Sequence, residues 1–180
     1  MLVSISLIFL ALVLAALLIP TIYAGFIGAP LLVTPKNAIR EALTKAQARK
    51  GEKLYDLGCG TGRIMLIAEK EFGLETVGFE LAPLIAWFAS LNLFFNLAKN
   101  SKVKNCNAYK QDLKNADIVF CFLQIGPMEE LKKKFSKELK VGSRIISYSF
   151  KIHGWEIEET ITGYPGNVYI YKIKNADNIL

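Results

Sequence analysis

The stretch Lys53-Leu-Tyr-Asp-Leu-Gly-Cys-Gly-Thr-Gly-Arg63 says most about the fold, because a short apolar strand runs directly into three glycines spaced two residues apart. Glycine has no Cβ, so Gly58, Gly60 and Gly62 let the chain turn sharply after the strand and let a ligand approach the backbone amides. The N–H groups of a following helix would face such a ligand. The segment therefore predicts a nucleotide-cofactor site between a strand and a helix.

The spacing of these glycines separates two classes of cofactor. The dinucleotide fingerprint is G-x-G-x-x-G, whereas this segment reads G-x-G-x-G and is preceded by an acidic residue, Asp56. Pyrophosphate binding is therefore not favoured. The arrangement resembles motif I of the class I, seven-strand S-adenosylmethionine (SAM) methyltransferases, in which the acidic residue and the glycine loop hold the methionine end of the cofactor.

Two further acidic residues follow later strand-like runs. Glu80 comes after the apolar run 76–79, at the distance from the glycine loop where nucleotide-binding βαβ units place a carboxylate that accepts hydrogen bonds from ribose hydroxyls. Asp112 follows the run 103–109, where the resembled enzymes place the residue that contacts the adenine amino group. A solvated strand end is the alternative for Glu80, and ordinary turn chemistry is the alternative for Asp112.

The N-terminal region carries no charged side chain from Met1 through Pro35, and Leu2 to Ile19 is an almost unbroken aliphatic run. Such a run is typical of a transmembrane helix. A cleaved secretory signal would normally have a basic start and a shorter apolar run, and a buried helix of this kind would be hard to cover in a small chain. We therefore expect a single membrane anchor with its exit segment over 1–30.

The charged residues, 22 basic and 16 acidic, all follow position 35, and the flank nearest the apolar run is basic. The positive-inside rule therefore places the following domain in the cytoplasm, where SAM is made. An anionic membrane surface explains the net charge of +6 without a nucleic acid as partner. The three scattered cysteines and the single histidine form no metal-binding pattern, so no metal is expected.

The remaining sequence alternates strand-like and helix-like runs, which is typical of an α/β fold with a parallel sheet and helices on both faces. The first helix is expected near 34–50, with Thr34 as its N-cap and Pro35 at its first position. Later helices are expected at 62–72, 83–98 and 127–140, and strands at 53–57, 75–80, 103–109, 117–123 and 143–150, with a closing hairpin over 156–173. This order predicts a Rossmann-like seven-stranded mixed sheet with an antiparallel final strand.

The expected helix over 83–98 has apolar side chains in nearly every direction, whereas a surface helix of a soluble enzyme would show a polar face. Either the preceding helix and the membrane-exit segment cover its outer side, or this side contacts lipid. The sequence leaves both alternatives open.

The chain as a whole resembles the small membrane-anchored lysine methyltransferases, whose mitochondrial members methylate lysines of the ATP synthase c subunit and the adenine nucleotide carrier. The resemblance is carried by the apolar N-terminus, the Thr34-Pro35 pair, motif I and the segments 78–83, 122–123 and 127–129. It implies a methyltransferase domain over 31–180 and SAM as the cofactor. It also implies a lysine substrate, in a membrane protein.

The same resemblance implies the residues of the site. The cofactor contacts would be made by Thr34, Asp56, Gly58, Cys59, Gly60, Gly62, Glu80, Leu81 and Asp112. The substrate pocket would lie at the carboxyl ends of the strands, where open α/β sheets bind ligands, and its candidate lining residues are Leu123, Gln124 and Trp155. For Trp155, packing in the core is the alternative. The segment 123–127 departs from the family pattern, which commonly has a polar residue after the proline of this motif.

Methyl transfer from a sulfonium is an in-line displacement with a good leaving group, so an enzyme mainly aligns the two molecules and excludes water. A lysine amine must be neutral before it attacks, and an apolar pocket favours this form by lowering its pKa. The lack of an obvious acid–base constellation is therefore compatible with an enzyme. Three alternatives stay open: methylation of a lipid or other hydrophobic small molecule, a tethered SAM-binding module without turnover, and a dinucleotide-binding regulatory domain.

Overall fold

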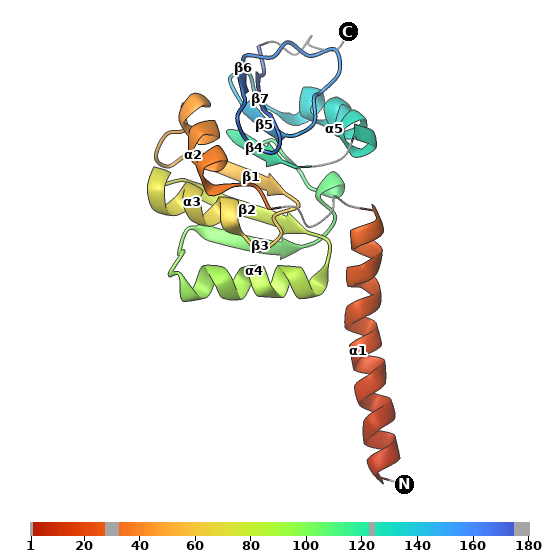
Figure 1. Ribbon diagram of the computed structural model, residues 1–180. Helices are drawn as coiled ribbons and strands as arrows, with labels where there is room; N and C mark the ends of the chain where they lie inside the picture. The colour runs from red at the N-terminus through yellow and green to blue at the C-terminus, as the bar shows by residue number, and fades with distance from the viewer. Residues whose placement is uncertain (1, 28–32, 123–124, 175–180) are drawn as a thin grey trace.

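The computed structural model describes residues 2–27, 33–122 and 125–174, and it shows a twisted sheet covered by helices with one long helix alongside (Figure 1). The long helix, α1, covers Leu2–Ile27 and carries no charged residue. The described ranges contain no helix with the length and the apolar character that crossing a bilayer requires. The helix expected at the N-terminus is thus present, whereas the transmembrane span expected over Leu2 to Ile19 is not confirmed.

Seven strands form one mixed sheet in the order β3-β2-β1-β4-β5-β7-β6. Pairing is parallel from β3 across to β5, and β7 runs antiparallel to both of its neighbours, β5 and β6. The predicted seven-stranded mixed sheet with an antiparallel final strand is confirmed. The strands are β1 Lys53–Leu57, β2 Glu75–Glu80, β3 Ser101–Asn105, β4 Ile118–Cys121, β5 Arg144–Tyr148, β6 Glu159–Ile161 and β7 Val168–Lys172.

Helices cover both faces of this sheet. On one face lie α2 Lys36–Lys45, α3 Arg63–Phe72 and α4 Pro83–Phe95, and on the other lies α5 Ile125–Glu138. The short turn η1, Ala108–Lys110, stands between β3 and β4 in place of a full helix. This layering follows from the right-handed crossovers that join neighbouring parallel strands.

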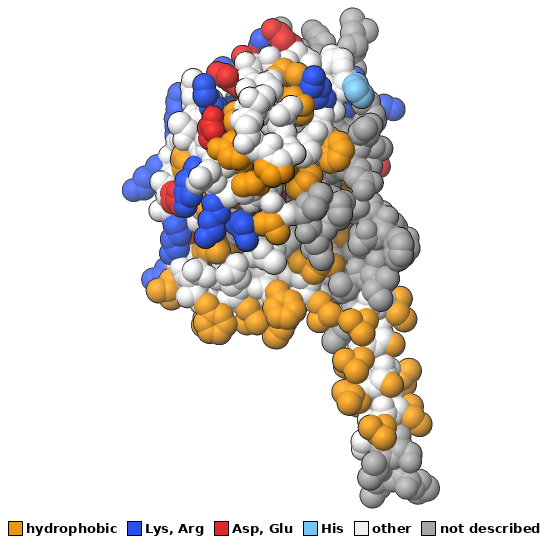
Figure 2. Space-filling model, viewed as in Figure 1, with side chains coloured by type: hydrophobic (Ala, Val, Ile, Leu, Met, Phe, Trp, Pro, Cys, Tyr) orange, Lys and Arg blue, Asp and Glu red, His pale blue; other side chains and the backbone are white. Residues whose placement is uncertain are grey.

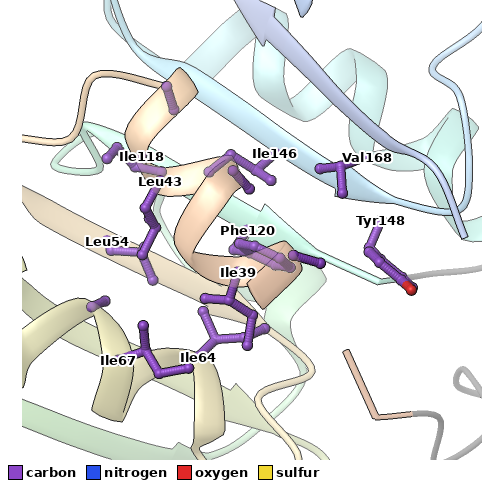
Figure 3. Close-up of a cluster of buried hydrophobic side chains, with 14 of the residues drawn as sticks. Ile39, Leu43, Leu54, Ile64, Ile67, Ile118, Phe120, Ile146, Tyr148 and Val168 are labelled. Carbon is purple, nitrogen blue, oxygen red and sulfur yellow. The ribbon is translucent and has the colours of Figure 1, made fainter. Parts of the chain in front are cut away.

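The core beneath α2 and α3 is built from aliphatic side chains that repeat on one side of each helix. Ile39 and Leu43 of α2 point toward the sheet, and Ile64 and Ile67 of α3 lie beside them (Figure 3). Strand residues such as Phe120 complete this cluster. The cluster fixes α2 and α3 against the sheet and so determines where the loop before α3 can lie.

The start of α2 differs from the prediction. The N-cap position is held by Pro35, whose ψ of 139° is extended and not helical, and no side chain caps the helix. Thr34 is instead buried, at 5% exposure. The expected Thr34 cap is therefore wrong, because the helix begins one residue later, and it also ends at Lys45, earlier than the expected position near 50.

The third strand is also shorter than expected. It ends at Asn105, and the chain then turns through η1, where the Asn107 side chain accepts a hydrogen bond from the N–H of Tyr109. Such a side-chain bond to the backbone two residues on competes with strand pairing. The expected extension of this strand to Tyr109 is therefore wrong.

Candidate functional site

The glycine loop leaves β1 at the carboxyl edge of the sheet and leads into α3. Gly58, Gly60 and Gly62 have φ values of 84°, 52° and 76°, a backbone conformation that favours glycine. A Cβ added to Gly60 would meet nothing within 4 Å, so this position opens onto free space. The loop thus has the sharp turn expected from the sequence, and a ligand can reach its backbone at Gly60.

The end of β2 holds this loop in place. The N–H of Gly58 donates to the carbonyl of Phe79 at 2.9 Å. The Glu80 carboxylate accepts from the N–H of Gly60 at 3.0 Å through one oxygen and from the N–H of Ala82 at 2.9 Å through the other. Glu80 therefore connects the loop to the start of α4. Because each carboxylate oxygen can accept a second hydrogen bond, the ribose contact stays a prediction that this arrangement permits.

Gly78, in the middle of β2, lies beneath the loop and was not singled out by the motif. A Cβ at this position would lie 2.7 Å from Sγ of Cys59 and would also collide with Met65. The missing side chain lets Cys59 pack there, at 5% exposure. Burial is the main cause that raises the pKa of the Cys59 thiol. An isolated glycine inside a strand is the sequence signal for such a close approach.

Asp56 lies on β1 just before the loop and is 1% exposed. Its Oδ2 atom has no hydrogen-bond partner among the described residues. Burial, together with the charge of Glu80, raises the pKa of Asp56 to about 8. Because buried carboxyl oxygens are normally paired, this atom indicates the position of a donor that a ligand supplies.

For three other predicted cofactor residues, the structure shows the position but no contact that bears on cofactor binding. Thr34 is buried before α2, and Leu81 is 39% exposed just after β2. Asp112 is exposed, and its Oδ1 accepts from the N–H of Lys114 at 2.9 Å. This is the turn chemistry that was its alternative. The cofactor contacts of these three residues stay predictions.

The predicted substrate-pocket residues fall into two groups. Leu123 and Gln124 lie outside the described residues. Trp155 is 9% exposed and packs against Phe135 and Tyr171, with ring centroids 6.5 Å and 6.2 Å away. The structure therefore places Trp155 in the core beside α5, which was its alternative, and its role in the pocket is not tested.

In the part of the chain that the structure describes, charged groups elsewhere do not form a second centre of this kind. Among the described residues there is no group of three His, Cys, Asp or Glu side chains that could hold a metal ion. A polar hollow lies at the opposite, amino edge of the sheet, but its walls carry ion pairs such as Arg144 with Glu52 and Lys140 with Asp117. Among the described residues, two buried side-chain atoms lack a hydrogen-bond partner: Oδ2 of Asp56 at the loop edge and Nε1 of Trp155 in the core. Of these two, only Asp56 is an ionisable group, and it lies beside the glycine loop.

Comparison with known proteins shows the family of this chain. Residues 56–159 match the ANTKMT methyltransferase domain family, and this range begins at Asp56 and includes the glycine loop and Glu80. The chain belongs to this methyltransferase family.

Individual relatives agree with the family. A protein-lysine N-methyltransferase of Saccharolobus islandicus (strain REY15A) is 35% identical over 150 residues, which cover 80% of this chain and 93% of the relative. A lysine N-methyltransferase of Mus musculus that is named for the ATP synthase c subunit is 27% identical over 79% of this chain, which spans 57% of the mouse protein. The solved structure of an RNA methyltransferase from Salinibacter ruber in complex with S-adenosyl-L-homocysteine is similar, with a TM-score of 0.77 and 26% identity over 79% of this chain and 94% of that one.

The chain is therefore a SAM-dependent methyltransferase of a protein-lysine methyltransferase family. The site fits this cofactor, which supplies a methyl group on a sulfonium ion. Asp56 offers a buried acceptor of the kind that an ammonium group requires, and Gly60 leaves room beside it. Glu80 holds the glycine loop in place by accepting a hydrogen bond from the N–H of Gly60.

Proposed function

We propose that this protein transfers a methyl group from SAM to the ε-amine of a lysine in a membrane protein. The observation that carries the proposal is the unpaired Oδ2 of Asp56 under the glycine loop, in a chain 35% identical to a protein-lysine N-methyltransferase. Relatives are named for lysines of the ATP synthase c subunit and of adenine nucleotide translocase. These names support lysine as the acceptor class.

The reaction has little need for dedicated acid or base residues in the protein. The lysine ammonium first loses a proton to water, and its nitrogen then forms an N–C bond as the C–S bond of the sulfonium breaks. The methylated amine leaves with one positive charge, so charge is conserved between donor and acceptor. The chain's own residues hold the donor in line and exclude water, which is the larger part of such catalysis.

The membrane-protein class of substrate is proposed from the apolar surface of this chain. The described side chains of α1 include large hydrophobic groups that are strongly exposed, up to 69% for Phe9. Because exposed apolar surface of this extent is unfavourable in water, we propose that α1 attaches the enzyme to a bilayer. The basic residues of α2, including Arg40 and Lys45, favour the cytoplasmic side of that bilayer for the catalytic domain.

Methyl transfer to membranes tests turnover and substrate class together. The full chain is incubated with methyl-labelled SAM and membranes of the source cell, and the Asp56→Ala chain serves as the control. We expect label in a protein band that survives lipid extraction and that yields methyl-lysine after hydrolysis.

Two other results would contradict the proposal. Label found only in the organic phase would assign the enzyme to lipids or hydrophobic small molecules. Label found nowhere, with SAM binding intact, would make the chain a binding module without turnover.

A further inference from the structure

The outer side of α4 and the residues flanking it form an exposed apolar surface. Within this surface, the exposed fraction rises from 39% at Leu81 to 75% at Phe95. Figure 2 shows hydrophobic side chains gathered along this edge of the domain. We call this surface the α4 strip, and its members are Leu81, Trp87, Phe88, Phe94, Phe95 and Leu97.

The described elements of the fold leave the α4 strip exposed. The inner side of α4 packs on the sheet through Ala86, Ala89 and Leu93. The buried side chains of α2 face the sheet and α3, so α2 does not serve as the cover considered from the sequence. α1 contacts α4, yet the strip residues keep their exposure in its presence.

Each polar side chain of α4 donates a hydrogen bond within the protein. Ser90 Oγ donates to the carbonyl of Ala86 at 2.8 Å, and Asn92 Nδ2 donates to the carbonyl of Thr61 at 2.8 Å. Asn96 Nδ2 donates to the carbonyl of Asn92, also at 2.8 Å. No charged residue occurs from Leu81 through Ala98. These internal hydrogen bonds lower the cost of placing the helix against an apolar medium.

Basic residues lie at the margin of the strip. Lys70 Nζ donates to the carbonyl of Leu97 at 2.8 Å, and the lysines at positions 99, 102 and 104 are exposed. The nearby acidic group, Glu69, is already engaged by the N–H of Asn100 and the hydroxyl of Ser101. An apolar surface with a cationic margin complements an anionic bilayer, whose acyl chains meet the aromatic rings while its headgroups meet the lysines.

The strip is also continuous with the apolar surface of α1. The two helices are in contact, and Figure 2 shows their hydrophobic side chains meeting at one end of the domain. One bilayer could therefore contact both. This continuity favours lipid over a soluble partner, because a partner matched to α4 alone would leave α1 exposed.

We propose that the α4 strip docks onto the surface of a bilayer that contains anionic lipids. This inference rests on the proposed function and adds the orientation of the domain at the membrane. Because Glu80 joins the glycine loop to Ala82 at the start of α4, docking holds the cofactor edge close to the membrane surface. The acceptor is then a lysine close to the bilayer surface.

Tryptophan fluorescence tests the docking directly. The full chain is mixed with vesicles of phosphatidylcholine and phosphatidylserine whose acyl chains carry bromine, a quencher that acts only at short range. Trp87 is 56% exposed on the strip, whereas Trp155 is 9% exposed in the core. We expect quenching in the natural chain and its loss in Trp87→Phe. Flotation of the same vesicles reports attachment separately.

Matched variants locate the contact. Phe94→Ser with Phe95→Ser should weaken vesicle binding about tenfold or more, because two large aromatic side chains no longer leave water. The control is Val141→Ser, which removes an apolar side chain of 68% exposure outside the strip and should bind as the natural chain does. Methyl transfer to a soluble lysine peptide should be unchanged in both, which separates docking from turnover.

Several results would overturn the docking proposal. One is flotation without quenching, which would leave α1 as the attachment and the strip in water. A second is quenching that persists in Trp87→Phe, and a third is a chain that does not float at all. A fourth is that the natural chain forms a dimer in vesicle-free solution and the Phe94/Phe95 variant is a monomer. This result would assign the strip to contact with a second copy of the chain.

Discussion

At the scale of single residues, Asp56 couples cofactor binding to pH. Burial and Glu80 raise the pKa of Asp56 to about 8, so its carboxyl is protonated at neutral pH before a ligand binds. A cationic group beside it favours the ionised form and lowers that pKa. Binding of the SAM ammonium should therefore release a proton from Asp56 below pH 8.

We accordingly predict that SAM affinity increases as pH rises from 6 toward 8, because less of the binding free energy is then spent on removing the proton from Asp56, whose pKa in the free protein is about 8. Calorimetry in buffers of different ionisation enthalpy measures the released proton. Asp56→Asn should abolish this release and flatten the pH dependence. An equal proton release in this variant would show that a group other than Asp56 loses the proton when SAM binds.

Glu80 gives a second prediction at this scale. Glu80→Ala removes the acceptor of two backbone N–H groups, those of Gly60 and Ala82, as well as the proposed ribose acceptor. We expect SAM binding to weaken by about 1–3 kcal/mol, the effect of leaving such groups unpaired. Titration calorimetry measures it. The control is Glu75→Ala, at the exposed opposite end of the same strand. A similar loss of SAM affinity in both variants would show that the substitutions act by destabilising the fold and not by removing a specific contact of the glycine loop.

At the scale of elements, α2 is held by its buried side and not by its cap. Leu43 is fully buried, whereas Thr44 beside it is exposed. Leu43→Ala should reduce the free energy of unfolding by about 2–5 kcal/mol. Thr44→Ala should change it by less than about 0.5 kcal/mol, as surface substitutions usually do. Urea denaturation measures both, and similar values would contradict the observed packing of α2 on the sheet.

The elements also show what the sequence could predict. β1, β2, α3 and the final hairpin followed from apolar periodicity and glycine punctuation, because those signals are local. The start of α2 could not be predicted, because it depends on the ψ angle of Pro35. Proline fixes φ but allows either a helical or an extended ψ, and the sequence fits both. The end of β3 depends on a side-chain bond at Asn107 that competes with pairing.

The site was predictable to the same degree. Asp56, the glycines and Glu80 meet at one edge because consecutive parallel strands end there. The structural role of Glu80 and the space below the loop at Gly78 depend on distances between separate strands, which spacing does not reveal. Trp155 lies in a segment after β5 that is fixed by a tertiary contact, the bond from the N–H of Ile152 to the Tyr171 hydroxyl.

At the scale of the whole molecule, the two ends of the strands have different surroundings. The carboxyl edge carries the cofactor loop and adjoins the start of α4, while the amino edge carries paired charges such as Arg144 with Glu52. Docking through α4 would therefore present the reactive edge, and not the charged hollow, to an acceptor in the membrane. The enzyme would then distinguish acceptors by where their lysines lie as well as by their sequence.

Docking through α4 predicts a difference between two forms of one substrate. Trp87→Ser with Phe95→Ser should slow methylation of a lysine in a vesicle-embedded protein severalfold, because the domain loses its orientation. It should leave kcat/KM for the same lysine in a soluble peptide unchanged, because both side chains point away from the packed core and are more than half exposed. Val141→Ser should alter neither rate. A parallel loss on both substrates would show that the variant damages the catalytic site, and equal rates on both would show that orientation does not govern access.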